Sequence, residues 1–116
     1  MKRRNRIILD KIIEEADFLS LSISGIDETE FLRNEMIKRA TCMTLINIGE
    51  LIKNLEDDIR TKYSEIPWKD FAGFRDVAAH GYFTLRMDRV WLYAKDEMPV
   101  FADQIKEILD SEEETD

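Results

Sequence analysis

Apolar residues recur every three or four positions along most of this chain, and polar residues fill the positions between them. This spacing is typical of amphipathic helices. It predicts a first helix from about residue 4 to residue 23 and a long second helix from about residue 28 to residue 61. Asp27 is the predicted N-cap of the second helix, with Glu30 as its capping-box partner. The first helix is expected to bury Ile8, Ile12, Ala16, Leu19 and Ile23.

The second half of the chain predicts shorter helices. Ile66-Pro67 marks the start of a third helix, because proline is tolerated at the first helical position, and this helix closes around His80-Gly81. Asp88 is the predicted cap of a fourth helix, which Pro99 should kink or break. No strand, internal repeat or linker is expected. The fold is therefore predicted to be all-α, an up-and-down bundle of four to five helices.

Three kinds of residue interrupt or extend the apolar stripes. Gly49 lies inside the long helix at a cost of about 1 kcal/mol relative to alanine, which indicates close packing of another helix or, alternatively, a ligand near the backbone. Met36, Met43 and Trp91 are expected in the core or at an interface. Glu50, beside the stripe, is interpreted as a surface or interhelical polar contact.

Length and charge narrow the classes of protein. A chain of 116 residues fits one domain, expected over residues 1–109, followed by an acidic tail at 110–116 that is expected to fray. The net charge of −8 argues against a general nucleic-acid coat protein, although residues 69–95 are locally cationic. One cysteine and one histidine leave no zinc ligand set. No cofactor, membrane span or signal peptide is expected, and the predicted location is the cytoplasm.

The candidate chemistry lies in Arg75-Asp76-Val77-Ala78-Ala79-His80-Gly81-Tyr82, which holds the only histidine of the chain. A guanidinium binds a phosphate through two parallel hydrogen bonds, and an imidazole exchanges protons near neutral pH. RNA cleavage without a metal ion needs both a base and an acid, which one imidazole serves poorly. A symmetric dimer would supply two histidines, so a homodimer is predicted.

Each of these residues has a structural alternative. His80-Gly81 is also a reasonable helix C-terminus. Arg75 and His80 would lie about 140° apart on a regular helix, and would converge only if the helix ends near Ala79 and Gly81 turns the chain. Asp76 could orient the imidazole or be a solvated charge. Tyr82 could hydrogen-bond a phosphate or pack its ring on the core.

The string Arg75-x4-His80-x-Tyr82 resembles the R-x4-H-x-Y motif of HepT-like toxins, a branch of the HEPN (higher eukaryotes and prokaryotes nucleotide-binding) superfamily. The resemblance extends from about residue 4 to residue 109. It is carried, in order, by Ile48-Gly49-Glu50, Ile66-Pro67-Trp68, Phe74-Arg75-Asp76, His80-Gly81-Tyr82-Phe83, Val90-Trp91 and Met98-Pro99.

The resemblance implies a homodimeric helical bundle with a metal-independent endoribonuclease site built from Arg75 and His80 of both chains. It also implies the role of toxin in a toxin-antitoxin pair, with RNA as substrate and an MntA-like minimal nucleotidyltransferase as antitoxin. In the family the antitoxin can transfer AMP to the motif tyrosine, here Tyr82. Two other hypotheses stay open: a non-catalytic binding subunit of a nucleotidyltransferase complex, and a plain bundle in which the motif is only a helix cap.

Overall fold

A computed structural model describes residues 1–81 and 85–115 of the chain, and for residues 76–81 it describes the backbone alone. The elements in order are α1 (Arg3–Ser22), α2 (Glu28–Arg33), α3 (Glu35–Lys53), α4 (Asp57–Lys62), α5 (Trp68–Gly81), α6 (Met87–Leu92), the π-helical segment η2 (Tyr93–Glu97) and α7 (Met98–Ser111). The described residues contain helices and no strand, which confirms the all-α prediction. The prediction of four to five helices is too low, because the predicted second helix is divided into α2, α3 and α4. Homodimerisation stays a prediction.

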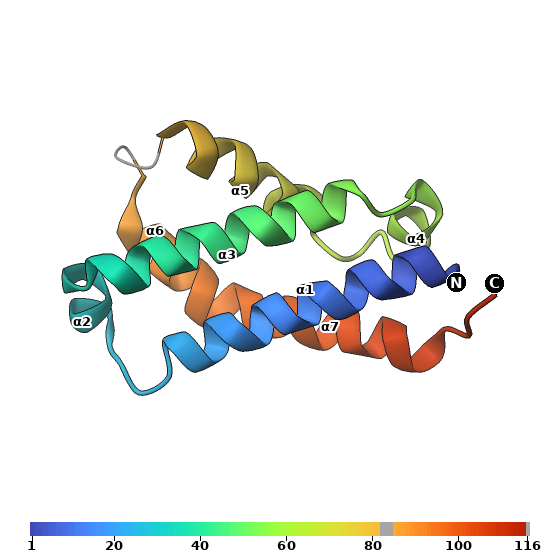
Figure 1. The fold of residues 1–116 in the computed structure, drawn as a ribbon, viewed down its shortest axis with the longest axis horizontal. Helices are drawn as coiled ribbons and strands as arrows, with labels where there is room; N and C mark the ends of the chain where they lie inside the picture. The colour runs from blue at the N-terminus through green and yellow to red at the C-terminus, as the bar shows by residue number, and fades with distance from the viewer. Residues whose placement is uncertain (82–84, 116) are drawn as a thin grey trace.

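The long helices lie side by side, and the two ends of the chain meet at the same end of the bundle (Figure 1). All five residues predicted for the buried stripe of α1 are buried, which confirms that stripe. Aromatic rings join α5 to α7: Phe71 stacks on Phe101 with ring centroids 4.2 Å apart, and Trp68 meets Phe101 edge-on. The core therefore fixes the first half of α5, the helix that carries the candidate motif.

The predicted helix over residues 28–61 is wrong in its continuity. The predicted capping box at its start is confirmed, with the Glu30 amide donating to Asp27 Oδ1 over 2.8 Å. The helix then stops at Asn34, whose backbone is extended and whose side chain accepts a hydrogen bond from the Ile37 amide over 3.0 Å. Asparagine is a strong N-cap, so it ends α2 and starts α3. A second break separates α3 from α4.

The predictions for the last helices need two corrections. Asp88 is not a cap: α6 begins at Met87 with Arg86 as its N-cap residue, and Asp88 in the first turn pairs with the Arg86 guanidinium over 2.8 Å. Pro99 is predicted to kink or break the helix, and the α-helical pattern of α6 does change to η2 immediately before it, although the backbone stays helical into α7. Pro99 falls in the first turn of α7, directly after η2, and a proline in a first turn removes no required amide donor. The π-helical segment absorbs the irregularity.

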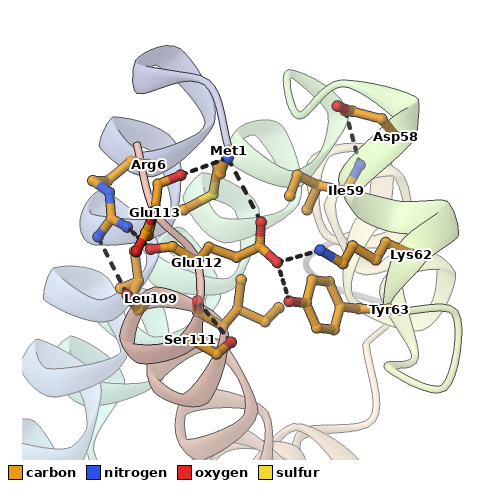
Figure 2. Close-up of polar contacts among 11 residues, drawn as sticks. Met1, Arg6, Asp58, Ile59, Lys62, Tyr63, Leu109, Ser111, Glu112 and Glu113 are labelled. Carbon is orange, nitrogen blue, oxygen red and sulfur yellow. Dashed lines mark hydrogen bonds and ion pairs between the residues drawn. The ribbon is translucent and has the colours of Figure 1, made fainter. Parts of the chain in front are cut away.

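The acidic C-terminal residues differ from the expected frayed tail. Helix α7 runs through Asp110 to Ser111, and the Glu112 side chain, only 11% exposed, turns back toward the N-terminal end of the bundle (Figure 2). Its carboxylate accepts hydrogen bonds from Lys62 Nζ over 2.6 Å and from the Tyr63 hydroxyl over 2.5 Å. These donors lower the pKa of Glu112 to about 2. The cations that this tail lacks locally come from Lys62 of α4 and from the Met1 amino group, which lies 3.6 Å from Glu112 Oε1.

The two chain ends also bind each other through the backbone. The Met1 amino group donates to the Glu113 carbonyl over 2.7 Å, and the Thr115 amide donates to the Met1 carbonyl over 2.8 Å. Arg6 of α1 donates to the Glu112 carbonyl (Figure 2). The last residues therefore close the end of the bundle opposite to the α5 C-terminus (Figure 1).

Candidate functional site

Helix α5 carries the candidate motif and begins where the sequence predicts, directly after Ile66-Pro67. Its first residue, Trp68, is buried and donates its indole N–H to the Tyr63 carbonyl over 3.0 Å. Phe71, one turn later, is 2% exposed. The start of α5 is thus fixed by packing and by a hydrogen bond before the chain reaches Arg75.

Gly49 of α3 fits the backbone of α5 closely at the level of Arg75. A Cβ atom on residue 49 would lie 2.7 Å from Arg75 Cβ, 3.1 Å from the Phe71 carbonyl oxygen and 3.3 Å from that of Ala72. Real carbon contacts are wider than the first of these distances. The prediction that Gly49 marks close helix packing is confirmed, because only a glycine lets the two helices approach this far.

Glu50, the neighbour of Gly49, forms an ion pair with Arg75 through Oε1 and Nε. The pair lies at the edge of the helix contact, where the Glu50 side chain is 45% exposed and the Arg75 side chain 36% exposed. The interpretation of Glu50 as an interhelical polar contact is therefore confirmed. The ion pair between Glu50 and Arg75 was not predicted. The sequence feature that could have indicated it is the position of Glu50 next to Gly49, a glycine in a helix interior.

The other predicted site residues are placed only in part. Helix α5 continues through His80 to Gly81, so the third helix closes where predicted, and it does not end near Ala79. Positions 75 and 80 are therefore about 140° apart around a regular helix axis. The side chains of Asp76 and His80 lie outside the described part of the chain, and so does all of Tyr82.

Part of the positive charge around the motif has a partner within the chain. Besides Arg75, Arg86 pairs with Asp88, and Lys95 lies over the Trp91 ring with its ammonium nitrogen 5.6 Å from the centroid. Lys69 and Arg89 are exposed as well, so the described part of this stretch keeps positive charge at the surface. Among the described residues no group of three or more histidine, cysteine, aspartate and glutamate side chains could hold a metal ion.

A surface hollow lies between α1 and α3 and reaches Glu50. Two of its lining residues join the helices, since the Asn47 side-chain amide of α3 donates to Glu15 Oε1 of α1 over 3.0 Å. The hollow is lined by Lys11, Glu14, Glu15, Asn47, Glu50 and Leu51. The Glu50–Arg75 pair thus connects the α3–α5 contact to the neighbouring α1–α3 surface.

None of the described helices is long and apolar enough to cross a membrane.

Comparisons with known proteins show that this chain is similar to a family described as ribonucleases. The sequence profile described as "Ribonuclease HepT-like" matches residues 10–108. Two similar proteins carry the name "Putative RNase". One, from Caldanaerobacter subterraneus subsp. tengcongensis, is 37% identical over 92% of this chain and 96% of its own length. The other, from Methanocaldococcus jannaschii, is 36% identical over 97% of both chains.

A third relative, from Thermococcus cleftensis, is named "Probable ribonuclease HepT" and is 30% identical over 85% of this chain and 90% of its own length. No solved structure matches the chain significantly. The matched range of the family profile includes both helices of the Gly49–Arg75 contact and the whole candidate motif.

Proposed function

Because the chain belongs to the ribonuclease HepT-like family, we propose that it is a metal-independent endoribonuclease and the toxin of a toxin-antitoxin pair. It acts on RNA in the cytoplasm as a homodimer. The observation that carries this proposal is the position of Arg75. This residue is the first of the R-x4-H-x-Y string and lies in the range that the family profile matches. Its Cβ atom packs against Gly49, which fixes its place on α5. A fixed, partly exposed guanidinium is suited to a scissile phosphate.

In this proposal Arg75 binds the phosphate and stabilises the charge that develops on it, while His80 transfers protons. One chain supplies one imidazole, and cleavage needs a base for the 2′-hydroxyl and an acid for the leaving 5′-oxygen. The course of α5 supports a site shared by two chains, because positions 75 and 80 are separated around its axis. Asp76 supports the site by orienting the imidazole.

Glu50 holds Arg75 before RNA arrives. Their ion pair is partly exposed, and exposed pairs of this kind contribute little free energy. A phosphate therefore competes with Glu50 for the guanidinium at small cost. Glu50 acts here as a positioning residue, which keeps the Arg75 side chain at the edge of the α3–α5 contact.

Tyr82 is the proposed point of control. An MntA-like nucleotidyltransferase, acting as antitoxin, joins the α-phosphate of ATP to the Tyr82 hydroxyl oxygen and releases pyrophosphate. The adenylyl group adds bulk and negative charge beside a site that must admit an RNA phosphate. The phenol is then a site of inactivation and not a catalytic group. Incubation with the partner and ATP should add the mass of one AMP to the wild type and none to Tyr82→Phe. An unmodified, folded wild type would remove this switch from the proposal.

The ribonuclease activity is tested by RNA cleavage in the presence of EDTA. Arg75→Ala and His80→Ala should each abolish cleavage and growth inhibition, with helical content unchanged by circular dichroism. Arg89→Ala is the matched control, since Arg89 is an exposed arginine of α6 outside the motif. Full cleavage by both motif variants would refute the assignment.

His80→Asn separates catalysis from helix capping, because asparagine can end a helix but cannot serve as an acid or base near neutral pH. It should be inactive. A stable complex with the nucleotidyltransferase, combined with no cleavage of any RNA by the unmodified wild type, would instead identify a non-catalytic binding subunit.

A further inference from the structure

The surface shared by α1 and α3 exposes large apolar side chains that the bundle does not cover. Ile7 and Phe18 of α1 are 45% and 50% exposed, and Met36 and Met43 of α3 are 83% and 56% exposed. Trp91, predicted with these methionines for the core or an interface, is buried. The two helices lie side by side and run in opposite directions (Figure 1). Met36, Met43 and Asn47 are seven and four residues apart and share one side of α3, and Asn47 lines a hollow together with Lys11 and Glu14 of α1. The exposed methionines therefore lie on the side of α3 that borders α1.

The exposed residues of α1 form a narrow stripe. Ile7, Lys11, Glu14 and Phe18 are exposed, and their spacing of four, three and four residues keeps them within about 60° around the helix. Within the described part of the chain neither Lys11 nor Glu14 forms an ion pair. We call this set the α1 stripe. It presents two apolar ends and two unlike charges between them.

The order of residues in the α1 stripe is self-complementary. If a second α1 lies antiparallel, with a two-fold axis passing between residues 12 and 13, Lys11 of each chain faces Glu14 of the other, and Ile7 faces Phe18. A parallel arrangement would oppose like charges instead. Isologous dimers place the same surface on both sides of the axis, and such self-matching of charge favours another copy of the chain over an unrelated partner.

We propose that the α1–α3 face docks a second copy of this chain, through an antiparallel contact between the two α1 stripes. The exposed methionines of α3 flank this contact, where flexible thioether side chains adapt to a partner surface. This inference rests on the proposed function, which requires two chains at one RNA, and it assigns the surface that joins them.

The position of the contact also relates the dimer to the candidate site. Lys11 and Glu14 line the same hollow as Glu50, and Glu50 pairs with Arg75. A two-fold axis through the centre of the α1 stripe therefore runs beside this hollow in both chains. The two Glu50–Arg75 pairs come to the same side of the dimer, one from each chain.

Charge reversal tests the antiparallel pairing. Lys11→Glu makes the stripe acidic and Glu14→Lys makes it basic, so each variant alone should weaken self-association at least tenfold in sedimentation equilibrium. Mixed together, the two variants should form a heterodimer, because both crossed pairs then join opposite charges. Lys69→Glu and Glu107→Lys are matched controls on exposed positions of α5 and α7, and both should dimerise like the wild type.

The double variant carrying Lys11→Glu and Glu14→Lys should also dimerise normally, since it exchanges the charges and keeps their pairing. A monomeric wild type, or single variants that dimerise as tightly as the wild type, would overturn the proposal, as would failure of the mixed variants to associate. Circular dichroism confirms that each variant is folded.

The outcome for the interface is separable from that for the ribonuclease. If the wild type dimerises, the charge-reversal variants behave as predicted and RNA stays intact, the proposed interface is supported and the ribonuclease activity is refuted. If the protein cleaves RNA and every charge-reversal variant dimerises as tightly as the wild type, only the proposed interface is refuted. Binding of the nucleotidyltransferase to the α1–α3 face of a monomeric chain would overturn the proposed occupant.

Discussion

Replacing Gly49 by alanine tests whether the contact between α3 and α5 is as close as the structure describes. Alanine in a helix interior normally stabilises by about 1 kcal/mol relative to glycine. Here the added methyl group would lie 2.7 Å from Arg75 Cβ and 3.1 Å from the Phe71 carbonyl oxygen. Neither atom is the end of a flexible side chain, so the two helices must move apart.

The expected magnitude follows from these opposing effects. Overpacking a close contact costs about 1 to 3 kcal/mol. The upper end applies because the obstacle consists of a Cβ atom and backbone carbonyl oxygens, which can move only with the helix. Subtracting the gain of about 1 kcal/mol in helix propensity leaves a net loss of about 2 kcal/mol in the free energy of unfolding. For a domain of this size that lowers the melting temperature by about 8 °C.

Gly73 of α5 provides the matched control. It also lies in a helix interior, but a Cβ there would meet no atom within 4 Å. Gly73→Ala should therefore stabilise the protein by about 0.5 to 1 kcal/mol. The two variants carry the same chemical change and are expected to shift stability in opposite directions.

Urea denaturation followed by circular dichroism measures both changes. RNA cleavage gives a second readout, because Gly49→Ala displaces Arg75 and should reduce activity more than Gly73→Ala. A Gly49→Ala protein that is as stable as the wild type would show that the helices have room for a side chain, and the argument that glycine positions Arg75 would be wrong.

Three further predictions concern the rest of the fold. The pKa of Glu112 is lowered from 4.5 to about 2 by its hydrogen bonds to Lys62 and Tyr63; its contribution to stability is therefore complete above about pH 4.5 and is lost as the pH falls toward about 2. Glu112→Gln should cost about 1 kcal/mol at pH 7, a value kept small by the exposure of the partner lysine. The difference from the wild type in urea denaturation should shrink below about pH 4.5 and vanish only below about pH 2, and a constant difference would contradict the assigned partners. Burial raises the pKa of the Cys42 thiol to about 11. At pH 8 iodoacetamide should therefore label the native protein at least a hundredfold more slowly than the urea-unfolded chain, and equal rates would show that this thiol is accessible. Asn34→Ala removes the cap between α2 and α3 and should cost about 1 kcal/mol in the same denaturation assay; an unchanged midpoint would mean that the cap is dispensable.

Hydrophobic spacing predicted the helices whose buried face is continuous and failed where a polar side chain redirects the backbone. Helix α1 lies within one residue of its predicted ends because its buried stripe alone specifies it. The break at Asn34 is invisible to this method, since Phe31 before it and Thr41 after it are both buried. A single amide that caps the following helix changes the direction of the chain without changing the apolar period.

Long-range contacts explain the other differences. A run of acidic residues predicts a solvated tail when only neighbours in sequence are considered. Glu112 instead meets Lys62, 50 residues away, and the Met1 amino group, more than a hundred residues away. In the same way, Gly49 predicted a close helix contact but did not identify the partner helix. The pairing of Glu50 with Arg75 could be predicted only from the packing of α3 on α5, which the sequence does not show.

The charges of the described residues also limit how the proposed ribonuclease can recognise RNA. A chain with a net charge of −8 has little sequence-independent attraction for a polyanion. Binding must then depend on the few groups that a phosphate can capture from weak partners, of which the partly exposed Glu50–Arg75 pair is one. A single pair of this kind offers little affinity, whereas two on one side of a dimer can hold the same RNA. Charge therefore favours the proposed dimer in addition to the single histidine.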